Sequence, residues 1–155
     1  MRVGLISDTH DQLRPEVFPH FEGVDLILHA GDVGRPEILA DLAALAPVHA
    51  VYGNTDRHGI VDACPAQVEL ELAGWKVLVT HGHELGSPNP ETLVRAYPGR
   101  DIIIFGHTHK PLLETLEGVL VVNPGAAGPA RFRFEASIAL MVLEPGQRRV
   151  RHIAL

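Results

Sequence analysis

Residues 3–10, VGLISDTH, run from a short apolar segment straight into an Asp-x-His sequence. We interpret 3–6 as a buried strand that ends shortly before Asp8 and His10. The same succession occurs four more times along the chain. Apolar runs at 26–28, 48–51, 77–80 and 102–105 lead into Asp32, Asn54, His81 with His83, and His107 with His109. Five predicted strands therefore lead into residue types that ligate metal ions.

The segments around these strands have helical and strand-like patterns. Helices are predicted over 13–21, from Pro36 through the apolar stripe Ile38, Leu39, Leu42 and Leu45, and over 91–97. A polar loop is predicted over 53–66, and further strands at 68–72, 75–80, 112–116, 119–122, 137–143 and 150–154. The front half is thus βαβ and the back half mainly β. This pattern predicts one domain, 1–155, in which two sheets pack face to face with helices outside.

The composition is that of an ordinary globular protein. Of 155 residues, 46% are apolar and 21% are charged, which excludes disorder as the main state. A net charge of −6, from 13 basic and 19 acidic residues, argues against broad adhesion to nucleic acid or anionic membranes. Cys64 is the single cysteine, which excludes an internal disulfide and a Cys-rich metal site. Because we find no signal peptide and no apolar run near the roughly 18 residues of a membrane helix, we expect a soluble cytoplasmic protein.

The side chains that follow the five strands predict a metal centre. In sheets with helical crossovers, the loops beyond the carboxyl ends of the strands meet in one crevice, so distant residues can converge. If these segments are extended, Asp8 and His10 point to the same face, as do His107 and His109. Carboxylate, imidazole and amide ligands without thiolate suit Mn²⁺, Fe²⁺, Co²⁺ or Zn²⁺. Each motif alone is weak evidence, but together the candidate ligands predict two ions bridged by a carboxylate.

This set of motifs resembles that of the calcineurin-like metallophosphoesterases. The family pattern D-x-H, G-D, G-N, H-G and G-H-x-H is matched by Asp8/His10, Gly31-Asp32, Gly53-Asn54, His81-Gly82 and Gly106-His107-Thr108-His109. The short chain and the sequence GNTD at 53–56 resemble the small bacterial and archaeal phosphodiesterases. The resemblance implies an α/β (α+β) fold, a four-layer αββα sandwich of two packed mixed sheets flanked by helices. It also implies one metal on Asp8, His10, Asp32 and His109, and a second on Asp32, Asn54, His81 and His107.

The resemblance further implies a phosphodiesterase with two divalent ions, for which we expect Mn²⁺, with Ni, Fe, Co or Zn as alternatives. Two ions about 3.5 to 4 Å apart lower the pKa of a shared water, so that metal-bound hydroxide attacks a clamped phosphoryl group in line. Asp32, Asn54 and His83 are the predicted catalytic residues. The ions outweigh the carboxylates of Asp8 and Asp32, so the site attracts a small phosphodiester although the chain is negative. The histidine ligands must be neutral, and we therefore expect activity to fall in acid.

One position departs from the family pattern. Many members have His after the Gly-Asn pair, whereas this chain has Thr55, whose hydroxyl is a poor acid at neutral pH. We therefore expect slow hydrolysis that favours good leaving groups, with His83 or His58 as alternative proton donors. The predicted substrate-binding residues are Thr55, His58 and Arg131. His29 is predicted to be a buried structural histidine, and Asn123 to brace the site.

Two other classes of function remain open. A protein-interaction scaffold resembling the retromer subunit of this fold would bind metal with little or no turnover, although the complete ligand set favours an enzyme. A phosphomonoesterase or short-nucleotide hydrolase would use the same metal centre. A nuclease acting on long nucleic acid is disfavoured because no basic stripe accompanies the site. We expect no membrane partner, while a homo-oligomer remains open, including one that pairs through the edge strand near Val150.

Overall fold

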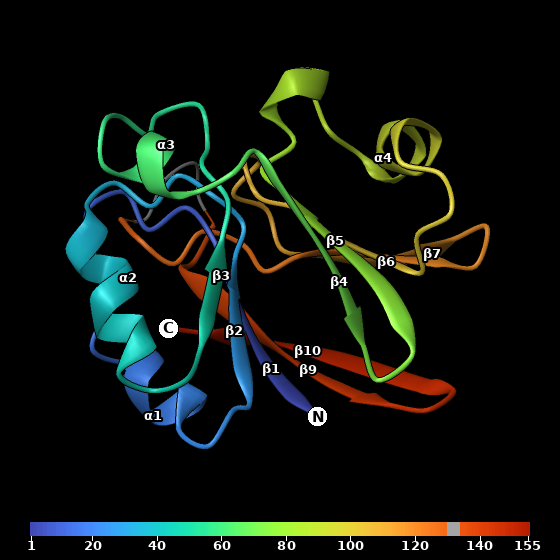
Figure 1. Cartoon of the computed structure of the whole chain (residues 1–155), viewed down its shortest axis with the longest axis horizontal. Coiled ribbons are helices and arrows are strands. Elements are labelled where there is room, and N and C mark those ends of the chain that lie inside the picture. The colour runs from blue at the N-terminus through green and yellow to red at the C-terminus, as the bar shows by residue number, and fades with distance from the viewer. Residues whose placement is uncertain (130–133) are drawn as a thin grey trace.

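The computed structural model describes residues 1–129 and 134–155 of the chain (Figure 1). Within these residues the strands are β1 (Arg2–Ile6), β2 (Leu26–His29), β3 (Val48–Ala50), β4 (Gln67–Leu72), β5 (Trp75–Thr80), β6 (Ile102–Ile104), β7 (Leu112–Leu116), β8 (Val119–Asn123), β9 (Ser137–Glu144) and β10 (Gln147–Ala154). The helices are α1 (Val17–Phe21), α2 (Pro36–Ala43), α3 (Ile60–Ala63) and α4 (Pro90–Ala96), with a 3-10 turn at His83–Leu85.

The strands form two five-stranded mixed sheets. Sheet A has the order β10-β9-β1-β2-β3, and sheet B has the order β4-β5-β6-β8-β7. In sheet A, β1, β2 and β3 are parallel, and in sheet B, β5, β6 and β8 are parallel. The remaining strands pair antiparallel with their neighbours. The five strands that carry the candidate ligands are therefore parallel members of the two sheets.

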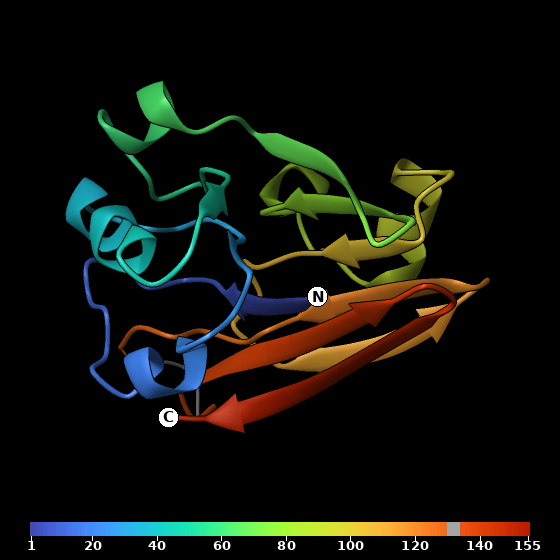
Figure 2. The ribbon, with the colours of Figure 1, turned by 60° about the horizontal axis from the view of Figure 1, so that its bottom comes forward.

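The two sheets pack face to face, and the helices lie on their outer sides (Figure 1 and Figure 2). Alternate residues of β1 face opposite ways, so Val3 and Leu5 pack between the sheets with Val77 of sheet B. Ile6 faces outward and packs in the cluster that includes buried residues of α1 and α2. Leu93 of α4 packs on the outer face of sheet B. This arrangement confirms the predicted four-layer αββα sandwich.

Most predicted elements are confirmed, with ends shifted by one or two residues, but three predictions were wrong in extent. The helix predicted over 13–21 begins only at Val17, because Pro15 precedes it, and Pro19 falls in the first turn, where a backbone N–H has no helical partner. The loop predicted over 53–66 contains α3, whose four residues are too few to show a helical period. β10 begins at Gln147 rather than at 150, because the charged residues before Val150 continue the alternation of the edge strand.

The helices of this fold are short. No helix within residues 1–129 and 134–155 combines the length and the apolarity that a membrane crossing requires. The longest of these helices, α2, has eight residues, whereas a spanning helix needs about 20.

Candidate metal centre

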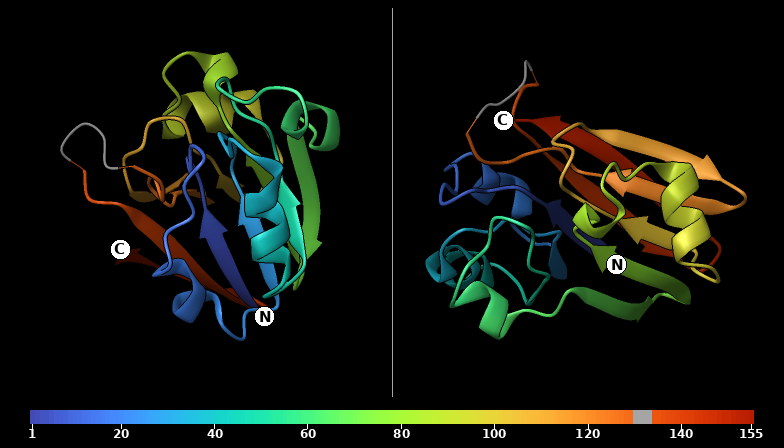
Figure 3. Two further views of the ribbon diagram at one scale, coloured as in Figure 1. Left: turned by 90° about the vertical axis from the view of Figure 1, so that its left-hand side faces the viewer. Right: turned by 90° about the horizontal axis from the view of Figure 1, so that it is seen from above.

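The loops that follow β1, β2, β3, β5 and β6 lie at the same end of the molecule (Figure 3). Backbone hydrogen bonds join them, since Asp8 N–H donates to the Gly31 carbonyl (2.9 Å) and His10 N–H donates to the Asp32 carbonyl (3.0 Å). Gly31 has φ 95°, and a Cβ there would lie 2.7 Å from Nδ1 of His81. A Cβ at Gly53 would lie 2.1 Å from Oδ1 of Asp32. These glycines allow the close approach that brings ligands from two sheets together.

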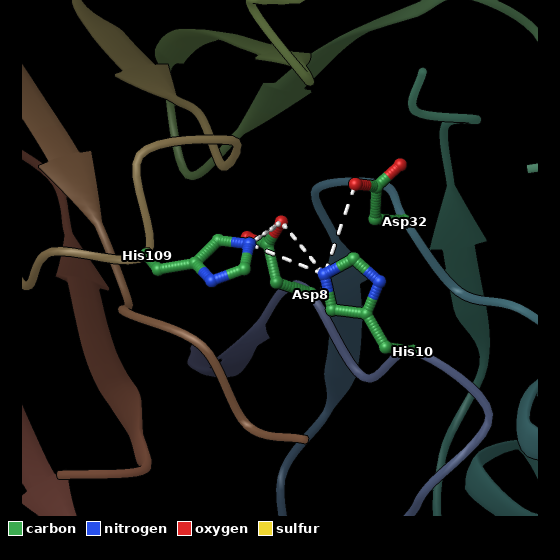
Figure 4. A group of neighbouring side chains, drawn as sticks. All are labelled: Asp8, His10, Asp32 and His109. Carbon is green, nitrogen blue, oxygen red and sulfur yellow. Dashed lines mark hydrogen bonds and ion pairs between the residues drawn. The ribbon is translucent and has the colours of Figure 1, made fainter. Parts of the chain in front are cut away.

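Four of the predicted ligands form one group, in which a ligand atom from each residue lies within 4.8 Å of the others. The members are Asp8, His10, Asp32 and His109. Figure 4 shows their polar atoms pointing toward a common centre. Nε2 of His109 lies 3.2 Å from Oδ1 of Asp8 and 3.1 Å from Nε2 of His10. Oδ2 of Asp32 lies 3.8 Å from the same His10 nitrogen.

The chemistry of this group fits a divalent cation. Oδ1 of Asp8 is buried and accepts no hydrogen bond from the residues that the structure describes, which is costly for an ionised carboxylate unless a cation compensates it. The other oxygen, Oδ2, is held by the Ser7 hydroxyl (2.6 Å) and by the backbone N–H of His107 (3.2 Å). Asp8 therefore presents one oxygen to the centre of the group, beside two imidazole nitrogens that also suit a metal.

The remaining predicted ligands form a second group beside the first. Oδ1 of Asn54 lies 3.1 Å from Nε2 of His81 and 3.0 Å from Nδ1 of His107. Nε2 of His81 is also 3.4 Å from Oδ2 of Asp32. Asp32 thus belongs to both groups, as the resemblance implies. An amide oxygen, two imidazoles and a shared carboxylate can hold a second divalent ion.

Charge pairing dominates the electrostatics of the second group. Burial alone would raise the pKa of the Asp32 carboxyl, but hydrogen bonding and charge from His81 hold that pKa well below its usual range. Burial alone would likewise lower the pKa of His81, but its hydrogen bond to Asp32 and the charges of Asp8 and Asp32 raise it. His107 differs, because burial and the nearby charge of His81 lower its pKa. In the metal-free protein, therefore, His81 holds a proton more tightly than a free imidazole does, and a cation must compete with that proton.

The backbone of the ligands differs from the extended conformation assumed for Asp-x-His and His-x-His. Asp8, His10, His107 and His109 have φ values of 54°, 44°, 67° and 59°. Asp32 also has a positive φ, 52°. The left-handed region is disfavoured for residues with a Cβ, although Asp, Asn and His enter it most readily. The prediction that each pair shares a face of an extended segment was therefore wrong, and tight turns bring these side chains together instead.

His29 connects the loops of β1 and β2 without joining either ligand group. Its Nδ1 accepts the N–H of Gly31 (3.2 Å), so its Nε2 carries the proton and donates to the Thr9 hydroxyl (3.0 Å). Thr9 in turn donates to the Val33 carbonyl (2.8 Å). Burial lowers the pKa of His29 to about 4, which keeps the ring neutral. The prediction of a buried structural histidine is confirmed by its burial and these contacts.

Asp56 is the supporting residue that the sequence analysis did not single out. Its buried carboxylate accepts hydrogen bonds from the N–H groups of Val33 (3.2 Å), Gly34 (2.8 Å) and Gly53 (2.8 Å). It therefore ties the loop that carries Asp32 to the loop that carries Asn54. The sequence shows only an acidic residue two places after Asn54. Its role as a hydrogen-bond acceptor between the two loops becomes visible only in the folded structure.

We expect Asp56→Asn to lower the melting temperature by several degrees and to weaken metal binding. The single amide oxygen of Asn cannot accept all three N–H groups, and each buried donor left unpaired costs about 1–3 kcal/mol. For a chain of this size, about 1 kcal/mol corresponds to roughly 2–4 °C. Calorimetry and a metal titration would measure the two effects. Asp41→Asn, at an exposed position on α2, is the matched control, and an Asp56→Asn variant as stable as that control would refute the role.

The other predicted residues lie at different distances from the two groups. The His83 ring centroid is 5.3 Å from that of His81 and 6.4 Å from that of His107, which places His83 at the rim. Thr55 donates its backbone N–H to Oδ1 of Asp32 (2.9 Å), and its hydroxyl lies 3.5 Å from Nδ1 of His10. The side chain of His58 is fully exposed and pairs with Asp62 at 3.6 Å, with no contact to either group among the described residues.

Arg131 and Asn123 are the two remaining residues for which a role was predicted. Arg131 lies outside the described residues, so its predicted contact with substrate stays a prediction. Asn123 donates from Nδ2 to the Gly106 carbonyl (2.8 Å) and to the Thr108 hydroxyl (3.0 Å). It therefore holds the turn between β6 and His109, as the bracing role predicts.

Comparison with known proteins places this site in a family. The calcineurin-like phosphoesterase superfamily domain matches residues 1–146. A probable metallophosphoesterase from Methanothermobacter thermautotrophicus is 39% identical, over 81% of this chain and 77% of the relative. A phosphodiesterase from Methanocaldococcus jannaschii is 30% identical, over 81% of this chain and 83% of the relative.

Solved structures agree with this placement. A structure described as a novel archaeal phosphodiesterase is 26% identical, with a TM-score of 0.80 and coverage of 100% of both chains. The crystal structure of Vps29 from Entamoeba histolytica complexed with Zn²⁺ is 25% identical, with a TM-score of 0.80 and 99% of each chain covered. The sequence, the fold and the ligand groups agree with these matches, and the chain belongs to the calcineurin-like phosphoesterase superfamily.

Proposed function

We propose that this protein is a dinuclear metal-dependent phosphodiesterase that hydrolyses a small phosphodiester, with Mn²⁺ as its expected ion. The observation that carries the proposal is the position of Asp32. Its Oδ2 lies 3.8 Å from Nε2 of His10 in the first group and 3.4 Å from Nε2 of His81 in the second. A carboxylate shared in this way suits a pair of ions that acts on one phosphoryl group.

The chain's own contribution is to orient the ligands. When bound, the two ions would activate a water near neutral pH and neutralise charge on the phosphoryl oxygens. Thr55 N–H holds Oδ1 of Asp32 and leaves Oδ2 for the centre of the site. The Ala30 carbonyl accepts a hydrogen bond from Nδ1 of His81 (2.8 Å), which directs Nε2 toward Asp32 and Asn54. Such contacts fix the tautomer and the direction of an imidazole ligand.

We propose His83 as the residue that faces the leaving group. Glu84 accepts hydrogen bonds from the Thr80 hydroxyl (3.1 Å) and the Tyr97 hydroxyl through Oε1, while its Oε2 lies 3.7 Å from Nδ1 of His83. Burial alone would raise the pKa of Glu84, but the hydrogen bonds from Tyr97, from Thr80 and from the backbone together outweigh it and lower that pKa. A charged Glu84 can therefore orient the His83 ring at the rim of the site.

Hydrolysis with refilled metal tests the function. The protein is stripped with a chelator, refilled with Mn²⁺, Ni²⁺, Zn²⁺ or Mg²⁺, and assayed on bis(p-nitrophenyl) phosphate and on p-nitrophenyl phosphate. We expect no turnover without metal and faster turnover of the diester with Mn²⁺. A faster monoester would assign a phosphomonoesterase, and metal binding without turnover of either compound would assign a scaffold.

We expect the rate to depend steeply on the acidity of the leaving group, because Thr55 supplies no proton at neutral pH. Thr55→His places an imidazole at that position and should raise the rate on poor leaving groups by about 100-fold, a typical contribution of a general acid. A series of aryl phosphodiesters measures the slope. Thr55→Val is the control and should leave the slope unchanged, whereas a shallow slope in the unaltered protein would contradict the expectation.

A scaffold is the second candidate, because the Vps29 structures share this fold. The complete ligand set of this chain supports the enzyme over the scaffold, although a metal site alone does not establish turnover. A short-nucleotide hydrolase is the other alternative and would be detected with dinucleotide substrates. The native ion and a cytoplasmic location remain predictions.

A further inference from the structure

A second feature lies on the outer face of sheet A, away from the metal centre. A hollow of about 300 Å³ is lined by Arg2, Arg149 and Arg151, by Leu140 and Val142 on its floor, and by Met141 and Val150 between them. We call it the arginine hollow. Arg2 begins β1, whereas the metal ligand Asp8 follows the other end of that strand. The hollow is therefore not part of the proposed active site.

The strand register places the three arginines on one face. Across the sheet, Arg2 of β1 pairs with Val142 of β9, which pairs with Arg149 of β10. Two residues further along β10, Arg151 pairs with Leu140 of β9. The intervening residues Val3, Met141 and Val150 pack in the core between the sheets. Because side chains alternate between the two faces of a strand, the arginines and the floor of the hollow share the outer face.

Little negative charge compensates these arginines. Arg149 lies 3.6 Å from Glu144, and their side chains are 70% and 51% exposed, so the pair is weak. The guanidinium of Arg2 contacts the Gly23 carbonyl at 3.5 Å. No carboxylate among the described residues lies within ion-pair distance of Arg151. A chain whose net charge is −6 thus carries a local positive patch here.

β10 also has a free edge. It is the last strand of sheet A, spans eight residues and lies along the lower border of the molecule in Figure 2. Its backbone bonds only to β9 within residues 1–129 and 134–155. Two-fold antiparallel pairing with β10 of a second copy, in the registers centred on Arg149, Val150 or Arg151, would bring arginines directly opposite arginines, which is unfavourable. A strand with acidic residues at alternate positions is the complementary partner.

We propose that β10 and the arginine hollow bind an extended acidic segment of a partner protein. The segment adds to sheet A as a sixth strand through backbone hydrogen bonds. Its acidic side chains, two residues apart, meet Arg149 and Arg151, and the apolar side chain between them faces the same way as Val150. This inference goes beyond the proposed hydrolase function and does not depend on it.

The test uses the full chain, isotopically labelled and loaded with Zn²⁺, and two capped peptides. The acidic probe is Gly-Val-Glu-Val-Glu-Val-Gly, and the basic probe has Lys in place of Glu. We expect the acidic probe to shift the backbone amide signals of β10, to slow their hydrogen exchange, and to bind about tenfold more tightly than the basic probe, as two exposed ion pairs allow. Its affinity should fall as salt rises.

Charge reversal identifies the surface. Arg149→Glu/Arg151→Glu, at exposed positions, should reverse the preference between the two probes. Arg151→Glu alone should weaken the acidic probe, while Arg95→Glu, an exposed arginine of α4, should not. Three results would overturn the proposal: no shift at β10 up to millimolar probe, equal binding of both probes, or shifts confined to the metal-centre loops. Light scattering that shows a dimer lost in Arg151→Glu would assign the edge to a second copy and also overturn it.

Discussion

Asp32→Asn is expected to reduce phosphodiester hydrolysis by at least about a thousandfold and to reduce the number of bound ions from two to one or none. Asp32 contributes to both ligand groups through the same oxygen, Oδ2. Metal ions contribute several kcal/mol of transition-state stabilisation, and about 1.4 kcal/mol corresponds to a factor of ten in rate. An amide in place of the carboxylate removes the negative charge that holds two cations close together.

The assay and the metal content are measured on the same preparations, refilled with Mn²⁺. Asp11→Asn is the matched control, since Asp11 is an exposed aspartate with positive φ one residue from His10 and outside both ligand groups. It should keep two ions and its rate. Two bound ions in Asp32→Asn would contradict the shared role of this carboxylate, and full activity with one ion would contradict the dinuclear mechanism.

The sequence was sufficient to predict which residues gather at the site, because residue type and strand order carry that information. Asp8, Asp32, Asn54, His81 and His107 each follow a parallel strand, and the carboxyl ends of such strands meet. The chemistry of the ligands could be inferred without coordinates, since carboxylate and imidazole at these positions have few other uses. Two packed sheets with helices outside followed from the same alternation of strands and helices, and the resemblance to the family implied the four-layer αββα sandwich.

The local geometry could not be predicted, because it depends on contacts made after folding. The left-handed backbone of His10 and His107 is invisible in a D-x-H or H-x-H pattern. Asp56 looks like an ordinary loop aspartate until two N–H groups from the loop of Asp32 and one from its own loop converge on it. α3 is stabilised by the burial of Ile60 and not by any periodic pattern. The arginine hollow likewise needs the register of three strands before its charges are seen together.

Metal binding is expected to raise the melting temperature of the chelated protein by about 10 °C or more at pH 8. A ligand at one hundred times its dissociation constant stabilises the folded state by about 2.7 kcal/mol per site. Two sites would give about twice that, and each kcal/mol corresponds to roughly 2–4 °C for a chain of this size. The buried Oδ1 of Asp8, which accepts no hydrogen bond from the described residues, gives the metal-free site a further reason to be destabilised.

The stabilisation by metal should be smaller at pH 5.5 than at pH 8. The pKa of His81 in the metal-free folded protein is raised, because burial, which alone would lower it, is outweighed by the hydrogen bond to Asp32 together with the charges of Asp8 and Asp32. The stability that this group contributes is therefore fully present below its unfolded pKa, near 6.5, and is lost as pH rises through the folded value. At pH 5.5 a metal must displace the proton that stabilises His81, whereas at pH 8 less of that competition remains.

Calorimetry with and without Mn²⁺ at the two pH values measures this difference. His81→Gln should lose about half of the shift at pH 8, because the second ligand group then lacks an imidazole while the first group keeps its ligands. His49→Gln, at an exposed position on β3, is the matched control and should keep the shift. An equal shift at both pH values would mean that no histidine ligand gives up a proton on binding. That result would assign the stabilising ion to the carboxylates alone and remove His81 from the site.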